Sequence, residues 1–247
     1  MKADFQLFDT FAEDYDTVVS IERKYVFFLE HLPQRRGAVL DVGCGGGLLS
    51  LELSNHFKRV TAIDISAPML AIAQRKRGAS NIEYRLCDAD KFTSDTRFDA
   101  IVSHTTFDHL PDVPATLAKL KRCLASGGRL IVIDCVARMP AIVPRWGIFY
   151  RILALMHVLP DMIRYRSKEA WALLRFRMSR AWIAHLQSDN YFSPARFIEV
   201  YAASLPGAHF TEMSNFIGVV WTAPTDKEEP NHSPEPMAAL RTAMPDR

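Results

Sequence analysis

Glycines and an acidic residue stand where a predicted strand ends, and their types and spacing suit a small cationic ligand. Residues 39–47 read VLDVGCGGG, an apolar strand that runs into glycines opening a helix. Such a loop lets the backbone turn sharply and lets a ligand approach it closely. Gly43, Gly45 and Gly47 follow G-x-G-x-G, which differs from the G-x-G-x-x-G of dinucleotide-binding loops. Asp41, directly before the loop, favours a cation over a pyrophosphate.

Two more acidic residues end the next two predicted strands. Asp64 follows Asp41 by 23 residues, a position from which a carboxylate can accept both ribose hydroxyls of a nucleoside. Asp88 lies in LCDAD (86–90), at the end of the third strand. Each residue alone is more typical of a helix cap or a solvated loop. Three acids at successive strand ends, together with a glycine loop, indicate one shared crevice.

Strands and helices of about ten residues alternate along the chain and must position these residues. We expect strands at 38–42, 59–63, 82–87, 98–103 and 129–136, and helices at 17–31, 48–57, 67–77 and 113–124. Ser66 is the expected N-cap of the third of these helices. Residues 138–185 are helical in composition, and a helix at 193–203 and a hairpin of strands at 208–214 and 216–222 follow. The alternation predicts right-handed βαβ units and a parallel sheet covered on both faces, with the hairpin at its edge.

Composition excludes several classes of protein. With 49% apolar residues in 247, the chain can bury a large core and is not disordered throughout. Its four cysteines form no CxxC pair, which disfavours a disulfide framework or a zinc site and indicates buried thiols in a reducing cytoplasm. The N-terminus lacks the apolar core of a signal peptide, and the most apolar stretch, 146–159, contains Arg151 and His157. We therefore expect a cytoplasmic protein with no transmembrane segment.

The formal net charge of +2 conceals an uneven distribution. Residues 138–185 contain nine basic residues against two acidic ones, a net charge of +7, which leaves −5 on the rest of the chain. Three of the four tryptophans also fall there. The arginines could recognise a carboxylate or phosphate of a small acceptor, lie on an anionic membrane, or stack on RNA. They could equally form a solvated face or a contact between copies of the chain. Because the arginines are dispersed, we rank a small molecule above lipid and lipid above nucleic acid.

As a set, these motifs resemble the class I S-adenosylmethionine-dependent methyltransferases of the small-molecule type. The resemblance rests on the glycine loop, VTAIDIS (60–66), CDAD (87–90), FDAIVSHTTFDHLPD (98–112), LKRCLASGGRLIVID (120–134) and the lid-like FDTFAEDYD (8–16). It covers about residues 5–136 and the closing hairpin. It implies an α/β fold with a Rossmann-like, doubly wound, seven-stranded sheet, mostly parallel with one antiparallel strand. A helical lid is expected between strands five and six.

The resemblance also implies domain limits. One methyltransferase domain is expected over 1–223, with N-terminal lid helices in 1–32 and a helical substrate lid in 138–190. A disordered tail is expected over 224–247, where prolines are frequent and apolar residues few.

The implied cofactor is S-adenosyl-L-methionine, with S-adenosyl-L-homocysteine as product. In the family pattern Asp64 takes the ribose hydroxyls, Ile65 packs on the adenine, and Asp88 with Ala89 reads the adenine amino edge. The full set of residues expected at the cofactor is Tyr15, Asp41, Gly43, Gly45, Gly47, Asp64, Ile65, Asp88, Ala89, Ser103 and His104.

At the methionyl end the resemblance places Ser103 and His104, with Tyr15 closing over them from the lid. A hydroxyl or ammonium acceptor must lose a proton, and a well-placed base accelerates such a step. Some sugar methyltransferases of this family use a histidine and an aspartate at similar loop positions. His109 as base, with Asp134 orienting His109 or the substrate, is therefore the expected catalytic pair, although both could serve packing and local hydrogen bonding alone. No pattern of metal ligands is visible.

The predicted function is methyl transfer to an O, N or C atom of a small aromatic or apolar acceptor, as in the biosynthesis of secondary metabolites. One alternative is a cyclase or other rearrangement enzyme that retains the cofactor as a non-reacting cation. A second is a quinone or lipid methyltransferase at the membrane surface, in peripheral contact through 145–185. A third is a non-enzymatic protein that has kept the fold. Whether the protein forms a homo-oligomer is left open.

Overall fold

The computed structural model describes residues 6–22, 25–137, 147–188 and 191–225 of the chain. Beyond Thr225, the tail expected to be disordered lies outside the described residues, as do 1–5 of the N-terminal lid and 138–146 and 189–190 of the insertion. Among the described residues, no helix combines the length and apolar character needed to cross a bilayer.

Seven strands form a single sheet in the order β3-β2-β1-β4-β5-β7-β6. Neighbouring strands are parallel except at β7, which runs antiparallel to both β5 and β6. The expected mostly parallel sheet with one antiparallel strand from the closing hairpin is therefore confirmed. The strands are β1 (Ala38–Val42), β2 (Arg59–Asp64), β3 (Ile82–Leu86), β4 (Phe98–His104), β5 (Leu124–Cys135), β6 (His209–Met213) and β7 (Phe216–Thr222).

Helices cover both faces of the sheet because alternate residues of each strand point to opposite sides. Val39 packs with α2 (Val26–Glu30) and α3 (Leu48–Ser54), whereas its neighbour Leu40 packs in the opposite layer with α5 (Val113–Cys123) and α11 (Pro194–Ser204). Along β1 every side chain is buried. This two-sided burial is what a central parallel strand requires.

Capping residues define where several of these helices begin. Ser66 precedes α4 (Ala67–Arg77), and its hydroxyl accepts a hydrogen bond from Met69 N at 3.3 Å, as predicted. Asp112 caps α5 and Ser193 caps α11 in the same way. The C-terminus of α3 differs from its prediction, because the helix ends at Ser54 and not at residue 57. There Asn55 N donates a hydrogen bond to Glu52 O.

The N-terminal segment differs from its prediction. A single helix was expected over 17–31, but α1 (Gln6–Glu22) and α2 are separate, and residues 23–24 between them lie outside the described part of the chain. The two helices pack against different parts of the protein, which one straight helix could not reach. Phe27 and Phe28 of α2 are buried against the sheet, whereas α1 contacts α4 and the inserted helices and is kinked at Phe11.

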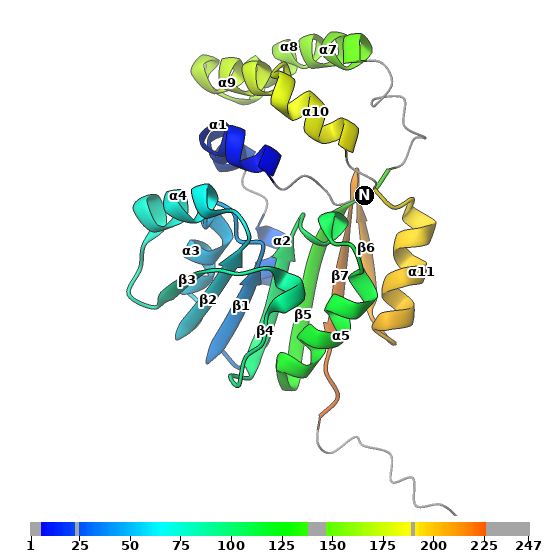
Figure 1. The fold of residues 1–247 in the computed structure, drawn as a ribbon. Coiled ribbons are helices and arrows are strands. Elements are labelled where there is room, and N and C mark those ends of the chain that lie inside the picture. Colours follow the sequence, from blue (N-terminus) through cyan, green and yellow to red (C-terminus); the bar gives the residue numbers. More distant parts are fainter. Residues whose placement is uncertain (1–5, 23–24, 138–146, 189–190, 226–247) are drawn as a thin grey trace, which may run out of the picture.

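In its described residues, the insertion between β5 and β6 forms four helices before α11. They are α7 (Gly147–Met156), α8 (Val158–Arg164), α9 (Ser167–Arg177) and α10 (Arg180–Ser188). Figure 1 shows these helices and α1 as a layer beyond the carboxyl ends of the parallel strands, with α7 and α8 farthest from the sheet. The helical composition of the insertion is confirmed for its described residues, and its helices lie over the edge where the acidic residues end their strands.

Candidate active site

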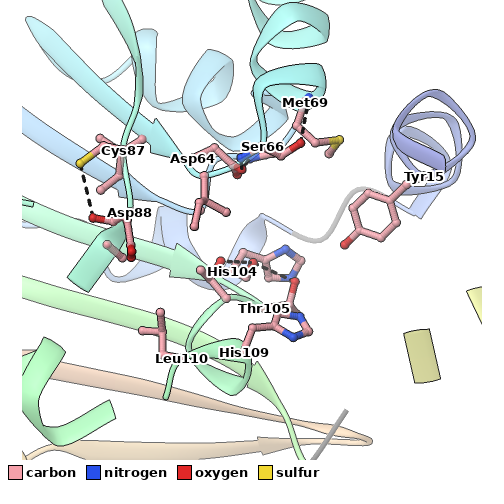
Figure 2. A pocket seen from close by; sticks show the side chains of 16 residues that line it. Tyr15, Asp64, Ser66, Met69, Cys87, Asp88, His104, Thr105, His109 and Leu110 are labelled. Carbon is pink, nitrogen blue, oxygen red and sulfur yellow. Dashed lines mark hydrogen bonds between the residues drawn. The ribbon is translucent and has the colours of Figure 1, made fainter. Parts of the chain in front are cut away.

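A pocket opens at the carboxyl ends of the parallel strands, beneath α1 (Figure 2). Eight of the eleven residues expected at a cofactor line it. Four come from the glycine loop and the end of β2, namely Gly43, Gly45, Asp64 and Ile65. The other four are Tyr15 from α1, Asp88 and Ala89 after β3, and His104 at the end of β4. The structure thus brings together residues from five separate segments, four of them at the carboxyl ends of parallel strands, as strands with a common edge predict.

The glycine loop needs glycine for two reasons. Gly43 has φ +71°, and a Cβ there would lie 2.0 Å from Thr106 Oγ1, so a side chain fits neither the backbone nor the space. Gly47 has φ +82° and begins α3, but it does not line the pocket. A Cβ on Gly47 would meet the Tyr84 hydroxyl at 2.5 Å. The role of Gly47 is therefore to let the loop approach β3 closely.

Asp64 is held between the glycine loop and the start of α4. Its Oδ2 accepts a hydrogen bond from Gly45 N at 2.7 Å, and its Oδ1 accepts one from Ser66 N at 2.8 Å. Burial raises the pKa of Asp64, while these backbone donors act in the opposite direction. A carboxylate can accept about four hydrogen bonds, so the two oxygens keep acceptor capacity toward the pocket.

Asp41 lies deeper, almost entirely buried at the end of β1. Its Oδ2 accepts a hydrogen bond from Ser50 Oγ at 2.6 Å, and burial raises the pKa of Asp41 to about 7. Asp41 lines a smaller pocket that shares Tyr15, Gly43 and His104 with the first. A cation in this pocket would favour the ionised form of Asp41.

Ser103 does not reach the pocket. It is fully buried, and its hydroxyl donates to Val42 O at 2.9 Å, which ties β4 to β1. Thr105 and Thr106, which follow His104 in the chain, line the pocket instead. Thr105 has φ +54°, an uncommon conformation for a residue other than glycine that is concentrated at functional sites. Sequence reasoning missed seven lining residues, namely Ile63, Ser66, Met69, Cys87, Thr105, Thr106 and Leu110.

His109 lines the pocket, and the carboxylate beside it is Asp108, whose Oδ1 lies 3.7 Å from His109 Nε2. The expected partner, Asp134, has other contacts. One oxygen accepts from the Tyr201 hydroxyl at 2.8 Å and the other from Thr106 N at 3.0 Å. Burial, and next the charge of Asp108, raise the pKa of Asp134. These contacts join the loop after β4 to α11.

Aromatic rings from three lid helices pack together beside the pocket, which Tyr15 lines and where His185 lies next to His109. Phe11 and Tyr15 of α1 pack against Phe176 of α9 and Trp182 of α10, with ring centroids 4.8–6.3 Å apart. His185 of α10 lies 5.1 Å from the Trp182 ring and 5.3 Å from the His109 ring. Burial lowers the pKa of His185 to about 4, so its imidazole is neutral at pH 7. We call these five side chains, Phe11, Tyr15, Phe176, Trp182 and His185, the aromatic wall.

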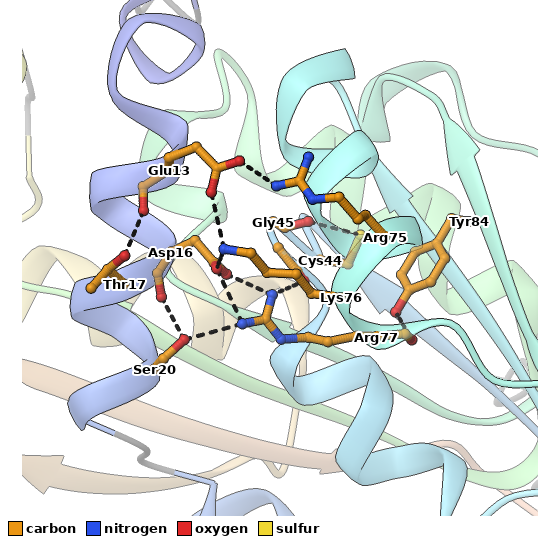
Figure 3. A network of polar contacts seen from close by, with 11 residues as sticks. Glu13, Asp16, Thr17, Ser20, Cys44, Gly45, Arg75, Lys76, Arg77 and Tyr84 are labelled. Carbon is orange, nitrogen blue, oxygen red and sulfur yellow. Dashed lines mark hydrogen bonds and ion pairs between the residues drawn. The ribbon is translucent and has the colours of Figure 1, made fainter.

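A network of ion pairs fastens α1 to α4 (Figure 3). Near the surface, Glu13 pairs with Arg75 and with Lys76. Lys76 also contacts Asp16, whose other partner is Arg77 in the interior. Arg77 Nη1 in turn donates to the carbonyl oxygen of Gly46 at 2.6 Å. The helix that carries Tyr15 is thus linked through Arg77 to the glycine loop.

The chemistry of these residues fits an adenosine-containing cation. Asp64 offers oxygens to hydroxyl groups, Ile65 offers an exposed apolar surface, and Asp41 offers negative charge beside a loop without side chains. Comparison with known proteins identifies a domain, since the model of a methyltransferase domain matches residues 40–132. Residues 40–132 of this chain thus correspond to a methyltransferase domain. The methyltransferase domain supplies the glycine loop and the ends of β1, β2 and β4.

Curated relatives of this chain carry the names of methyltransferases with different acceptors. Over 132 residues it is 31% identical to malonyl-[acyl-carrier protein] O-methyltransferase of Bacillus cytotoxicus, covering 50% of this chain and 46% of that protein. Over 129 residues it is 36% identical to demethylmenaquinone methyltransferase of Thermus thermophilus, covering 50% and 56%. The chain therefore matches about half the length of these curated relatives.

Solved structures agree in fold. The complex of DhpI with SAM and HEP has a TM-score of 0.57 and 22% identity, covering 90% of this chain and 96% of that one.

Among the described residues, no group of three or more His, Cys, Asp or Glu side chains could hold a metal ion.

Proposed function

We propose that this protein transfers a methyl group from S-adenosylmethionine to an O, N or C atom of a small, aromatic or apolar acceptor. The observation that carries the proposal is the position of Asp64. Its carboxylate is held by Gly45 and Ser66 at the edge of a pocket whose opposite side reaches His109, close to the aromatic wall. One pocket therefore joins a nucleoside-binding end to an enclosed end suited to an apolar acceptor.

At the cofactor end, Asp64 accepts the ribose hydroxyls and Ile65 packs on the adenine. Asp88 and Ala89 contact the adenine edge, and the loop backbone around Gly43 and Gly45 follows the methionyl part. Asp41 supplies the negative charge for the cationic portion. Gly47 and Ser103 act indirectly, since one shapes the loop and the other ties β4 to β1.

When bound, S-adenosylmethionine supplies a methyl group on a sulfonium sulfur, which is already strongly electrophilic. The chain's task is then to align the acceptor and to exclude water. Correct alignment alone contributes up to about 7–11 kcal/mol to lowering a barrier. The aromatic wall performs this task, because Tyr15 lines the pocket and packs against rings of α9 and α10, while His185 lies against His109.

His109 is the general base for an acceptor that must lose a proton. Its imidazole borders the pocket, and Asp108 beside it stabilises the imidazolium that forms. Asp134 is a positioning residue, which holds Thr106 and thereby the loop that carries His109. His185 stays neutral and faces His109 from the lid. Residues 1–223 act as one domain, with lids formed by 1–32 and 138–190.

Release of S-adenosylhomocysteine over a panel of acceptors tests the proposal. The panel contains hydroxylated aromatics, amines and prenylated quinols, with mass spectrometry to locate the methyl group. We expect stoichiometric S-adenosylhomocysteine and a methylated product with at least one aromatic or apolar acceptor. Conversion of an acceptor without S-adenosylhomocysteine release would instead identify a rearrangement enzyme. Binding of the cofactor with no conversion of any acceptor would favour a non-enzymatic role.

A further inference from the structure

The outer helices of the insertion expose an apolar stripe. Ile152, Leu155 and Met156 of α7 and Leu159 and Ile163 of α8 are between 49% and 81% exposed, at intervals of three or four residues. Among the side chains of α7 and α8 that the structure describes, the buried ones are Ala154 and Asp161, on the opposite side of the helices. A surface helix of a globular protein normally turns its apolar stripe inward. Here the arrangement is reversed, and we call these five exposed side chains the outer apolar face.

Basic side chains surround this face. Arg151, Arg164, Arg166 and Lys168 are exposed on α7, on α8 and at the start of α9. The acidic residues in the described part of the insertion are engaged elsewhere. Asp161 is buried and pairs with Arg177 at 2.5 Å, and Glu169 accepts a hydrogen bond from Arg166 N at 3.1 Å. The surface is therefore apolar at its centre and positive at its rim.

The face also has a defined position relative to the pocket. Figure 1 shows α7 and α8 at the end of the molecule farthest from the sheet. Both helices contact α9, which carries Phe176 of the aromatic wall. A surface bound to α7 and α8 would thus lie against the helices that cover the pocket.

We propose that the outer apolar face docks on an anionic phospholipid bilayer, with its apolar side chains inserted at the interface and its arginines and Lys168 at the headgroups. A stripe of large apolar residues with basic flanks is the pattern of helices that lie in the membrane interface. Charge decides against a second copy of the chain, because a two-fold contact would bring the basic rims of both copies together without exposed carboxylates between them. RNA would leave the apolar centre without a partner.

The docking is independent of methyl transfer, so vesicle binding tests it without any acceptor. Co-sedimentation of the full chain is measured with vesicles of phosphatidylcholine alone and of phosphatidylcholine mixed with phosphatidylglycerol. We expect binding to the mixed vesicles that weakens with added salt, because exposed charges are screened. Replacing Arg164 and Lys168 by serine lowers the partition coefficient about 30-fold, since each basic residue near an anionic surface contributes about 1 kcal/mol.

The apolar contribution is tested with the double substitution Leu159→Glu and Ile163→Glu. We expect the partition coefficient to fall at least tenfold, because two large apolar side chains are no longer available for transfer from water into the bilayer. Val26→Glu is the matched control, since Val26 is 65% exposed on α2, away from the insertion. Circular dichroism and thermal melting establish that each variant is folded. If the double glutamate variant does not fold, the double serine variant and the dependence of binding on salt decide whether the face binds the membrane.

Three results would overturn the proposal. One is no sedimentation with the anionic vesicles, and another is equal sedimentation with neutral and anionic vesicles. The third is unchanged binding by both double variants. A dimer in analytical ultracentrifugation that Leu159→Glu with Ile163→Glu dissociates, without vesicle binding by the wild type, would assign the face to a second copy of the chain.

Discussion

Asp16 of α1 and Arg77 of α4 form an ion pair in which both side chains are almost completely buried, 2% and 8% exposed. The guanidinium donates to both carboxylate oxygens, at 2.6 and 3.2 Å. Since Arg77 also donates to Gly46 O, the pair fixes the N-terminal helix against the glycine loop. The lid that carries Tyr15 and Phe11 is thus attached at the ligand-binding loop itself.

Removing the buried carboxylate should therefore destabilise the protein strongly. Asp16→Ala leaves the Arg77 charge in the interior, and breaking such a pair costs about 3–5 kcal/mol of unfolding free energy. Glu13→Ala is the control, because Glu13 is exposed and solvent screens its ion pairs, so its loss should change stability little. Urea unfolding measures both. Equal losses for the two variants would show that the buried pair has no special role.

Cofactor affinity should increase with pH because of Asp41. Burial holds the pKa of Asp41 at about 7 in the folded protein, whereas the pKa of an aspartate in an unfolded chain is near 4. Without ligand, the folded protein therefore loses stability as the pH rises from about 4 to about 7. A cation beside Asp41 favours its ionised form and releases the proton. Calorimetry at pH 6 to 8 in buffers of different ionisation enthalpy should detect this release for S-adenosylmethionine. Asp41→Asn should abolish it, and proton release that persists in this variant would assign it to another group.

His109 and His185 should respond differently to substitution. His109→Ala is expected to lower kcat about 10²–10⁴-fold with an acceptor that loses a proton, the usual contribution of a general base. His185→Ala should chiefly raise KM, because a group whose pKa is about 4 is a weak base at pH 7. Steady-state kinetics and the pH profile of kcat separate the two. A loss of kcat larger in His185→Ala than in His109→Ala would exchange their roles.

Tyr201 tests whether Asp134 acts on structure or on the reaction. Tyr201→Phe removes the donor to Asp134 Oδ2 inside the protein, and an unsatisfied buried polar group costs about 1–3 kcal/mol. We expect that loss of unfolding free energy in chemical denaturation together with a kcat within about threefold of the wild type. A positioning role for Asp134 would be contradicted by a collapse of kcat with unchanged stability.

Local signals predicted the sheet and its acidic edge well. The bounds of β1, α4 and β7 agree with the sequence because an apolar run, a serine cap or an isolated hairpin strand marks each one. Contacts between distant segments were beyond such reasoning. Tyr201 lies 67 residues from Asp134, and no pattern in either segment indicates that they meet.

The lid shows a second limit. Its helical character follows from composition, but which side of α7 and α8 faces the protein depends on packing against α9. The positive φ of Thr105 also has no local signal, because residues other than glycine adopt it only when their surroundings impose it.

Calorimetric titration of S-adenosylmethionine into wild type and Asp64→Ala tests the central claim most directly. Two lost hydrogen bonds to a charged carboxylate correspond to about 3–6 kcal/mol in total, so affinity should fall at least a hundredfold. Asp95→Ala, at an exposed aspartate outside the pocket, should bind like the wild type. Folded Asp64→Ala that binds S-adenosylmethionine as tightly as the wild type would contradict the account.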